Sequence, residues 1–310
     1  MNPRTVVRPV AVVGAGVIGR SWTLVFLRAG CPTALFDTDG AQLERAAAWI
    51  RSQQDGPWHA RLCDSLPQAL DGVTYVQECG PERLPLKQQL FAELDRAAPP
   101  GAILASSTSA FDMTEIARDV KLPQRCIVAH PVNPPHIVPV VEVLGGARTD
   151  PQVVRETLEF LRGLGQSPVL LRKHIHGFVL NRLQFALVRE AMHLLKAGVA
   201  DVDAIDAVVR DGLGLRWALL GPFAVADTNK DDGARAYFGE YVDWYTDLMN
   251  QLGPTPVIDK TLIEQIGRAL DDARGQTSRE QVRAWRDRMV GEIRRLKADN
   301  PLHAVQEQPL

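Results

Sequence analysis

The chain has 310 residues, 45% of them hydrophobic and 23% charged, and its formal net charge at pH 7 is −2. This is the composition of a globular protein of about two domains, without the excess positive charge that binds nucleic acids or anionic membranes. The four cysteines are scattered and no apolar run approaches the ~18 residues of a membrane span, so we expect a cytoplasmic protein with no metal site.

Residues 1–176 alternate short apolar runs with amphipathic stretches. Continuous apolar runs of this length are typical of parallel strands that are covered on both faces. The predicted strands are Val10–Val13, Thr33–Phe36, Val73–Val76, Ala102–Ala105, Cys126–Ala129, Val138–Val143 and Val169–Leu171. Helical patterns lie between them, one with Leu43, Ala46, Ala47 and Ile50 on a single face. The alternation predicts an α/β fold, a doubly wound sheet of the Rossmann type.

Residues 177–310 change to helical patterns. An apolar stripe covers residues 179–195, an aromatic stripe covers 237–248, and a last apolar stripe covers 282–296. Asp201 or Asp203 is expected to cap one of these helices. The sequence therefore predicts an all-α second domain, and because its stripes exceed what a small lone domain needs, we expect it to form a homodimer.

A GxGxxG motif, Gly14-Ala15-Gly16-Val17-Ile18-Gly19, follows the first predicted strand and opens a helix. In a dinucleotide-binding turn such glycines allow a tight turn, a close approach to a pyrophosphate and close packing of helix on strand. The helix N-terminus then offers free N–H groups to the phosphates. We expect Gly14, Gly16, Val17, Ile18 and Gly19 to bind the cofactor. Asp37 ends the second strand, where a carboxylate binds ribose hydroxyls and repels a 2′-phosphate, so NAD is favoured over NADP.

His130 follows a predicted strand, at the carboxyl end where an open α/β sheet binds its ligands. Glu142 lies in the next strand, and a hairpin-like return would bring it beside His130. A neutral imidazole can accept a hydroxyl proton while a carboxylate on its other nitrogen fixes the tautomer. A structural role stays open for both residues. Three other histidines are nearby alternatives: His136, His174 and His176.

Several motifs together resemble the 3-hydroxyacyl-CoA dehydrogenase superfamily. They are Ser106–Ser109, His130–Pro134, Val141–Val143 and Gly177–Arg182. Asp211–Trp217, followed by Gly221-Pro222, is closer to the branch that holds lambda-crystallin and L-gulonate 3-dehydrogenase. The resemblance covers roughly residues 8–235, and it implies an NAD-dependent dehydrogenase that acts on a secondary alcohol.

The resemblance also implies roles for individual residues. His130 is similar to the family's catalytic base and Glu142 to its acidic partner, while Ser109 and Asn181 match the groups that bind the substrate oxygen. Glu82 and Lys87 match positions near the nicotinamide ribose. Ser107 stands where the acyl-CoA enzymes usually have asparagine, and we expect it to contact the cofactor or the substrate.

The segment between Asp37 and Glu78 is shorter than in the acyl-CoA enzymes and has no lysine before Val73. We therefore expect a small free acid with a 3-hydroxyl rather than a CoA thioester. Its carboxylate needs a cationic or amide partner, for which the candidates are Arg182, Arg216 and Asn133.

Three alternatives remain at this point. A 3-hydroxyacyl-CoA substrate is one, and carnitine is another, since Trp217 offers an aromatic face to its trimethylammonium group. The third is a crystallin-like structural protein that binds NAD without turnover.

Overall fold

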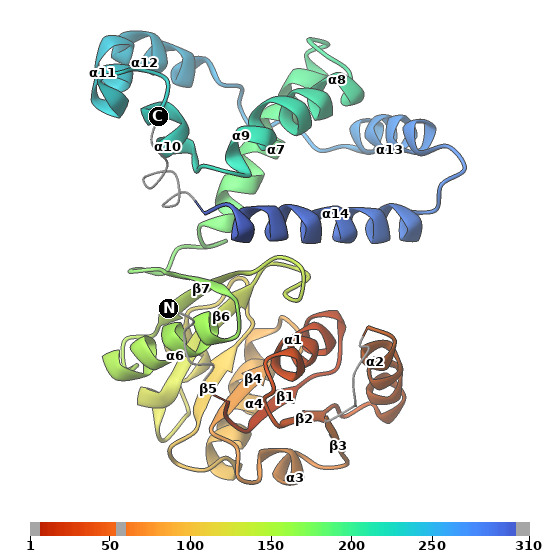
Figure 1. Cartoon of the computed structure of the whole chain (residues 1–310), viewed down its shortest axis with the longest axis vertical. Helices are drawn as coiled ribbons and strands as arrows, with labels where there is room; N and C mark the ends of the chain where they lie inside the picture. The colour runs from red at the N-terminus through yellow and green to blue at the C-terminus, as the bar shows by residue number, and fades with distance from the viewer. Residues whose placement is uncertain (1–6, 54–59, 302–310) are drawn as a thin grey trace. The chain divides into compact units, whose positions relative to one another are not determined.

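The computed structural model describes residues 7–53 and 60–301 of the chain (Figure 1). The chain divides into two compact units, residues 1–181 and residues 182–310. Helix α7 (Leu180–Lys196) runs through this division, which lies a few residues after the predicted one at residue 176. We describe the two units separately.

The first unit is built on an eight-stranded sheet with the order β3-β2-β1-β4-β5-β6-β7-β8. Neighbouring strands are parallel except for β6 and β7, which are antiparallel. The strands are β1 (Val10–Val13), β2 (Thr33–Phe36), β3 (Arg61–Cys63), β4 (Tyr75–Glu78), β5 (Ile103–Ser106), β6 (Cys126–Pro131), β7 (Val140–Gly145) and β8 (Ser167–Leu170). The predicted doubly wound α/β domain is confirmed, and β3, which is short and half-exposed, is the strand that the apolar pattern missed.

Helices cover both faces of this sheet (Figure 1). Helices α1 (Val17–Arg28), α2 (Gly40–Ser52) and α6 (Pro151–Gly163) bury one core, in which Phe26 stacks between Trp22 and Phe160 with ring centroids 5.4 and 6.1 Å away. The other core lies under α3 (Leu66–Leu70), α4 (Leu84–Ala97) and α5 (Met113–Ile116). A 3₁₀ turn, Pro123–Arg125, leads into β6. Burial on both faces explains the continuous apolar runs of the central strands.

Helix α4 has leucines at four-residue spacing, Leu86, Leu90 and Leu94, but it does not bury all of them. Leu86 is 37% exposed, whereas Lys87, Phe91 and Leu94 are buried. The burial of Lys87 goes with its ion pair to the buried Glu78, and the apolar pattern alone gives no sign of this contact.

The second unit is helical, as predicted. After α7 come α8 (Val202–Ala207), a π-helical segment (Val208–Leu213), α9 (Gly214–Trp217), α10 (Pro222–Asp227), α11 (Gly233–Glu240), α12 (Val242–Gln251), α13 (Lys260–Arg274) and α14 (Arg279–Asp299). Of the two cap candidates, Asp201 caps α8, accepting a hydrogen bond from the N–H of Ala204 at 2.8 Å.

The buried core of this second unit is small. Leu195, Val202 and Leu262 form its centre, with Met192, Ile205, Ile266 and Ala269 partly buried around them. Much of the three predicted stripes is exposed instead, including Leu183 on α7, Trp244 on α12 and Trp285 on α14. None of the helices within residues 7–53 and 60–301 combines the length and apolar character needed to cross a membrane.

Candidate functional site

The glycine-rich turn between β1 and α1 is shaped for a close approach to a ligand. Gly14 has a φ of 102°, and a Cβ there would lie 2.7 Å from the carbonyl oxygen of Cys79. A Cβ on Gly19 would overlap the carbonyl oxygen of Gly14. Gly16 differs from both, since a Cβ there would meet no protein atom within 4 Å. The first and third glycines therefore serve packing, and the second leaves its backbone open to a ligand.

The turn also has the electrostatics of a pyrophosphate site. Gly16 is the N-cap of α1 and has no side chain to bind the first amides of the helix. These amides lack intrahelical acceptors and carry the positive end of the helix dipole. Val17 and Ile18 lie in this first turn, and their contact with the cofactor stays a prediction.

Asp37 stands at the end of β2 beside this turn. Its Oδ2 accepts a hydrogen bond from the N–H of Ala15 at 2.6 Å, and its Oδ1 accepts one from the N–H of Asp39 at 2.9 Å. A carboxylate has about four acceptor positions, and Asp37 is only partly buried, so acceptor capacity remains for two ribose hydroxyls. The residues present thus fit the adenosine half of NAD.

The predicted pair of His130 and Glu142 is formed by the antiparallel strands. His130 on β6 is directly opposite Glu142 on β7 in the sheet register. Nδ1 of His130 lies 2.9 Å from Oε2 of Glu142, and both side chains are buried. Because an ionised carboxylate only accepts hydrogen bonds, Nδ1 carries the proton and Nε2 is left as a base.

Glu142 is held as an anion by a second set of contacts. Its Oε1 accepts hydrogen bonds from the N–H groups of Val179 and Leu180, both at 2.9 Å. Burial disfavours the carboxylate, but the hydrogen bonds from His130, Leu180 and Val179 outweigh burial and hold the pKa of Glu142 below its usual value. The carboxylate is therefore ionised and fixed at both oxygens.

Ser109 is held by a network centred on Glu82. Oε1 of Glu82 accepts hydrogen bonds from the N–H of Ser109 at 2.8 Å, from its hydroxyl at 3.3 Å and from the hydroxyl of Thr108 at 2.7 Å. Burial disfavours the Glu82 carboxylate, but these contacts and Lys87 outweigh it and lower its pKa. The loop after β5 is thus fixed with Ser109 partly exposed.

Lys87 lies behind Glu82, 2% exposed. Its Nζ is 2.9 and 3.0 Å from the two oxygens of Glu78, and 3.3 Å from Oε2 of Glu82. Glu78 is fully buried and also accepts a hydrogen bond from the Ser106 hydroxyl at 2.6 Å. Lys87 therefore joins the buried carboxylate of Glu78 to the exposed one of Glu82. Its predicted contact with the nicotinamide ribose stays a prediction.

Sequence reasoning missed Glu78 and Gln77, the last two residues of β4. Gln77 donates a hydrogen bond to the Ser107 hydroxyl at 2.8 Å, which fixes this predicted cofactor residue from behind. Two polar residues at the carboxyl end of a central strand were the available signal for this network.

The remaining predicted residues lie elsewhere. Asn181 is in the first turn of α7, directly after the amides that bind Glu142, and Asn133 is exposed in the link between β6 and β7. Arg182, Arg216 and Trp217 belong to the helical unit, so their approach to His130 stays a prediction. Of the alternative histidines, His174 binds the carbonyl oxygen of Ala110 through Nε2 at 3.0 Å.

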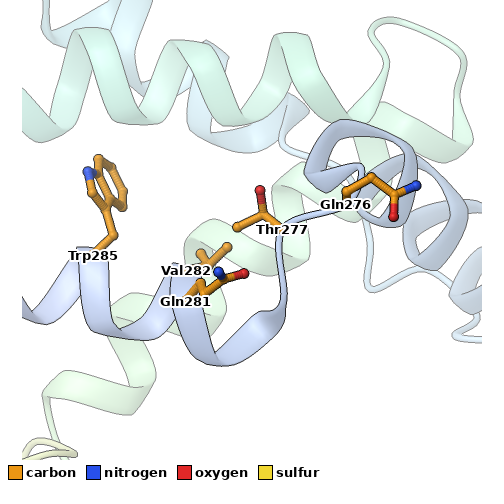
Figure 2. Close-up of a pocket in the computed structure, with 5 residues that line it drawn as sticks. All are labelled: Gln276, Thr277, Gln281, Val282 and Trp285. Atoms are coloured by element: carbon orange, nitrogen blue, oxygen red, sulfur yellow. The ribbon is translucent and has the colours of Figure 1, made fainter.

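A hollow of about 520 Å³ lies at the connection between α13 and α14 in the helical unit (Figure 2). Its lining residues are Gln276, Thr277, Gln281, Val282 and Trp285. It contains none of the predicted site residues and no charged side chain, so it offers no chemistry for proton or hydride transfer.

Two family descriptions match this chain. The NAD-binding domain of 3-hydroxyacyl-CoA dehydrogenase matches residues 9–175, and the C-terminal domain of 3-hydroxyacyl-CoA dehydrogenase matches residues 177–270.

Individual proteins are similar over nearly the whole chain. A lambda-crystallin homolog from Bos taurus is 37% identical, covering 94% of this chain and 96% of its own. An L-carnitine dehydrogenase from Streptomyces griseus is 36% identical, covering 96% of this chain and 92% of its own. Among solved structures, an NAD⁺-dependent 5-formyl-3-hydroxy-2-methylpyridine 4-carboxylic acid 5-dehydrogenase has a TM-score of 0.80 at 27% identity. The match covers 94% of this chain and 98% of that structure's chain.

Proposed function

Because the chain belongs to the 3-hydroxyacyl-CoA dehydrogenase family, whose members are NAD-dependent dehydrogenases acting on CH–OH groups, we propose that it oxidises the 3-hydroxyl of a small free hydroxy acid. L-Gulonate and similar 3-hydroxy acids are the proposed substrates, and the 3-keto acid is the product. The observation that carries the proposal is the buried pair of His130 and Glu142, 2.9 Å apart, at the ligand-binding end of the sheet.

In this mechanism Nε2 of His130 accepts the proton of the substrate hydroxyl. Glu142 stays ionised and stabilises the imidazolium that forms. Ser109 and Asn181 bind the substrate oxygen and orient the C–H bond that breaks. NAD, held by the glycine-rich turn and Asp37, supplies the hydride acceptor.

A free acid rather than a CoA thioester is supported by the region after Asp37. The only helix described between β2 and β3 is α2, which ends at Ser52, and residues 38–72 contain no lysine. CoA carries phosphate groups that need cationic partners, and the cationic residues of this region are Arg45, Arg51 and Arg61, the first of which is paired with Asp39. The similar proteins named for carnitine and for a pyridine carboxylic acid point the same way, since both names denote free carboxylic acids.

Carnitine is the second candidate substrate. It is itself a small 3-hydroxy acid. An L-carnitine dehydrogenase from Streptomyces coelicolor is 37% identical over 93% of this chain and 94% of its own length. Its trimethylammonium group requires an aromatic or anionic contact, for which Trp217, 41% exposed, is the candidate.

The test is NADH formation across a panel of L-gulonate, other free 3-hydroxy acids, carnitine and short 3-hydroxyacyl-CoA thioesters. We expect the highest kcat/KM with a free acid, and a higher value with a thioester would overturn the proposal. His130→Asn should lower kcat by ~100-fold or more, while His176→Asn, which changes an exposed histidine, should leave it unchanged. NAD binding without turnover on any alcohol would instead favour the crystallin-like alternative.

We further propose that the helical unit forms a homodimer. Apolar residues spaced along one face of α14 are all at least 40% exposed, namely Val282, Trp285, Met289, Ile293 and Leu296. Each fully buried apolar side chain stabilises the folded state by ~1.5–3 kcal/mol, while ordering each backbone residue costs ~1–2 kcal/mol. The small core around Leu195, Val202 and Leu262 therefore requires burial of further apolar surface to stabilise the helical unit. A second copy supplies the same apolar faces.

Sedimentation at micromolar concentration tests this proposal, and a monomer would refute it. Met289→Glu should shift the wild-type dimer toward monomer, whereas Arg288→Gln, at the adjacent exposed position, should leave the mass unchanged.

A further inference from the structure

Phe178 has an unusual backbone. Its φ is 50°, and among residues 7–53 and 60–301 it is the one non-glycine residue with a positive φ. The left-handed region is uncommon and strained for a residue with a bulky side chain. Phe178 is also fully buried. Surrounding contacts must therefore hold it in this conformation.

The backbone of Phe178 leads directly to the Glu142 contacts. Gly177, with a φ of 78°, and Phe178 form two consecutive left-handed residues. The next two N–H groups, of Val179 and Leu180, are those that bind Oε1 of Glu142. The turn thus points the first amides of α7 at the carboxylate that orients His130.

The ring of Phe178 lies between two imidazoles. Its centroid is 5.4 Å from that of His130, with the planes at 60°, and 5.9 Å from that of His174, with the planes at 87°. His174 binds the carbonyl oxygen of Ala110, the residue after Ser109. One side chain therefore contacts the His130 ring and the histidine that holds the Ser109 loop.

We propose that Phe178 is a positioning residue of the reaction. Its turn fixes Glu142, and its ring fixes the plane of His130, so that Nε2 points at the substrate hydroxyl. His174, the other ring beside Phe178, holds the Ser109 loop through the carbonyl oxygen of Ala110. This inference rests on the proposed role of His130 as the base.

The test compares Phe178→Leu with Phe91→Leu, which changes an equally buried phenylalanine on α4, in the same core but outside the site. Apolar replacements of similar volume are the ones that a packed core tolerates best, so both variants should fold with similarly lowered Tm. We expect kcat of Phe178→Leu to fall by about 10- to 100-fold with KM for NAD little changed, and Phe91→Leu to keep the kcat of the wild type. A kcat equal in the two variants would overturn the proposal.

A second measurement needs no substrate. Nitrogen-15 NMR of histidine-labelled protein, with the His130 signals assigned by His130→Asn, reports which nitrogen carries the proton. We expect one Nδ1–H tautomer in the wild type and in Phe91→Leu, and a mixture in Phe178→Leu. An unmixed tautomer in Phe178→Leu would refute the positioning role even if no substrate is ever turned over, so failure of this inference is separable from failure of the proposed function.

If Phe178→Leu does not fold, His174→Gln is measured in its place. It leaves Phe178 intact and removes the imidazole on one side of its ring. We expect a smaller loss of kcat with the same unchanged KM for NAD, and an unchanged kcat would count against the proposal.

Discussion

Replacing Lys87 with methionine should destabilise the first unit strongly, because Lys87 neutralises the Glu78 carboxylate, which is buried away from water. Lys87 and Glu78 are 2% and 0% exposed in their side chains, and the Nζ lies 2.9 Å from Oε1 of Glu78. Burial opposes the charge on Lys87, but Glu78 and Glu82 outweigh it and raise the pKa of Lys87 above its usual value. Lys87→Met removes that charge and leaves Glu78 buried without a cation.

Removing one partner of a buried ion pair costs about 3–5 kcal/mol, most of it the penalty of the charge left behind. A domain of this size loses about 2–4 °C in Tm for each kcal/mol, so we expect a loss of roughly 6–20 °C. Lys121→Met, at an exposed lysine, is the matched control and should change the free energy of unfolding by less than ~0.5 kcal/mol.

Urea unfolding at several pH values measures the effect. The pKa of Lys87 is raised, so its stabilisation is complete below its unfolded pKa of ~10.4 and is lost only above that. The pKa of Glu82 is lowered, so its stabilisation is present above ~4.3 and is lost as the pH falls. The difference in free energy of unfolding between wild type and Lys87→Met should therefore be constant from neutral pH to about pH 9. It should narrow below about pH 4.3, where the stabilisation by Glu82 is lost. A loss below about 1 kcal/mol at neutral pH would refute the reasoning, and Glu78→Gln added to Lys87→Met should recover part of the stability.

Two further predictions concern the cofactor site. Gly16→Ala should keep the Tm of the wild type and weaken NAD binding, because a Cβ at Gly16 meets no protein atom. Gly19→Ala should lower the Tm, because a Cβ at Gly19 overlaps the Gly14 carbonyl. Calorimetry and NAD titration of both variants separate the two effects, and equal Tm losses would contradict this account. Asp37→Ala should raise KM for NAD by about tenfold or more and reduce the preference for NAD over NADP. Kinetics with both cofactors measure this preference, and an unchanged preference would show that Asp37 does not contact the ribose.

The parts of the fold that follow local rules were accessible from the sequence. Central strands buried on both faces contain continuous apolar runs, and the pairing of His130 with Glu142 followed from two strands joined by a short link. The buried charges were not accessible, because Lys87 and Glu78 look like surface residues until the packing of α4 on the sheet brings them together. The left-handed conformation of Phe178 was likewise invisible, since a positive φ is uncommon for a bulky residue and the sequence pattern gives no sign of it.

The register of the β6–β7 pairing places His130 next to Glu142. The two residues lie directly opposite each other, and residues 132–139 form the link between the two strands. We expect exchanges within this link, such as at Asn133, to alter substrate choice while the register keeps His130 beside Glu142.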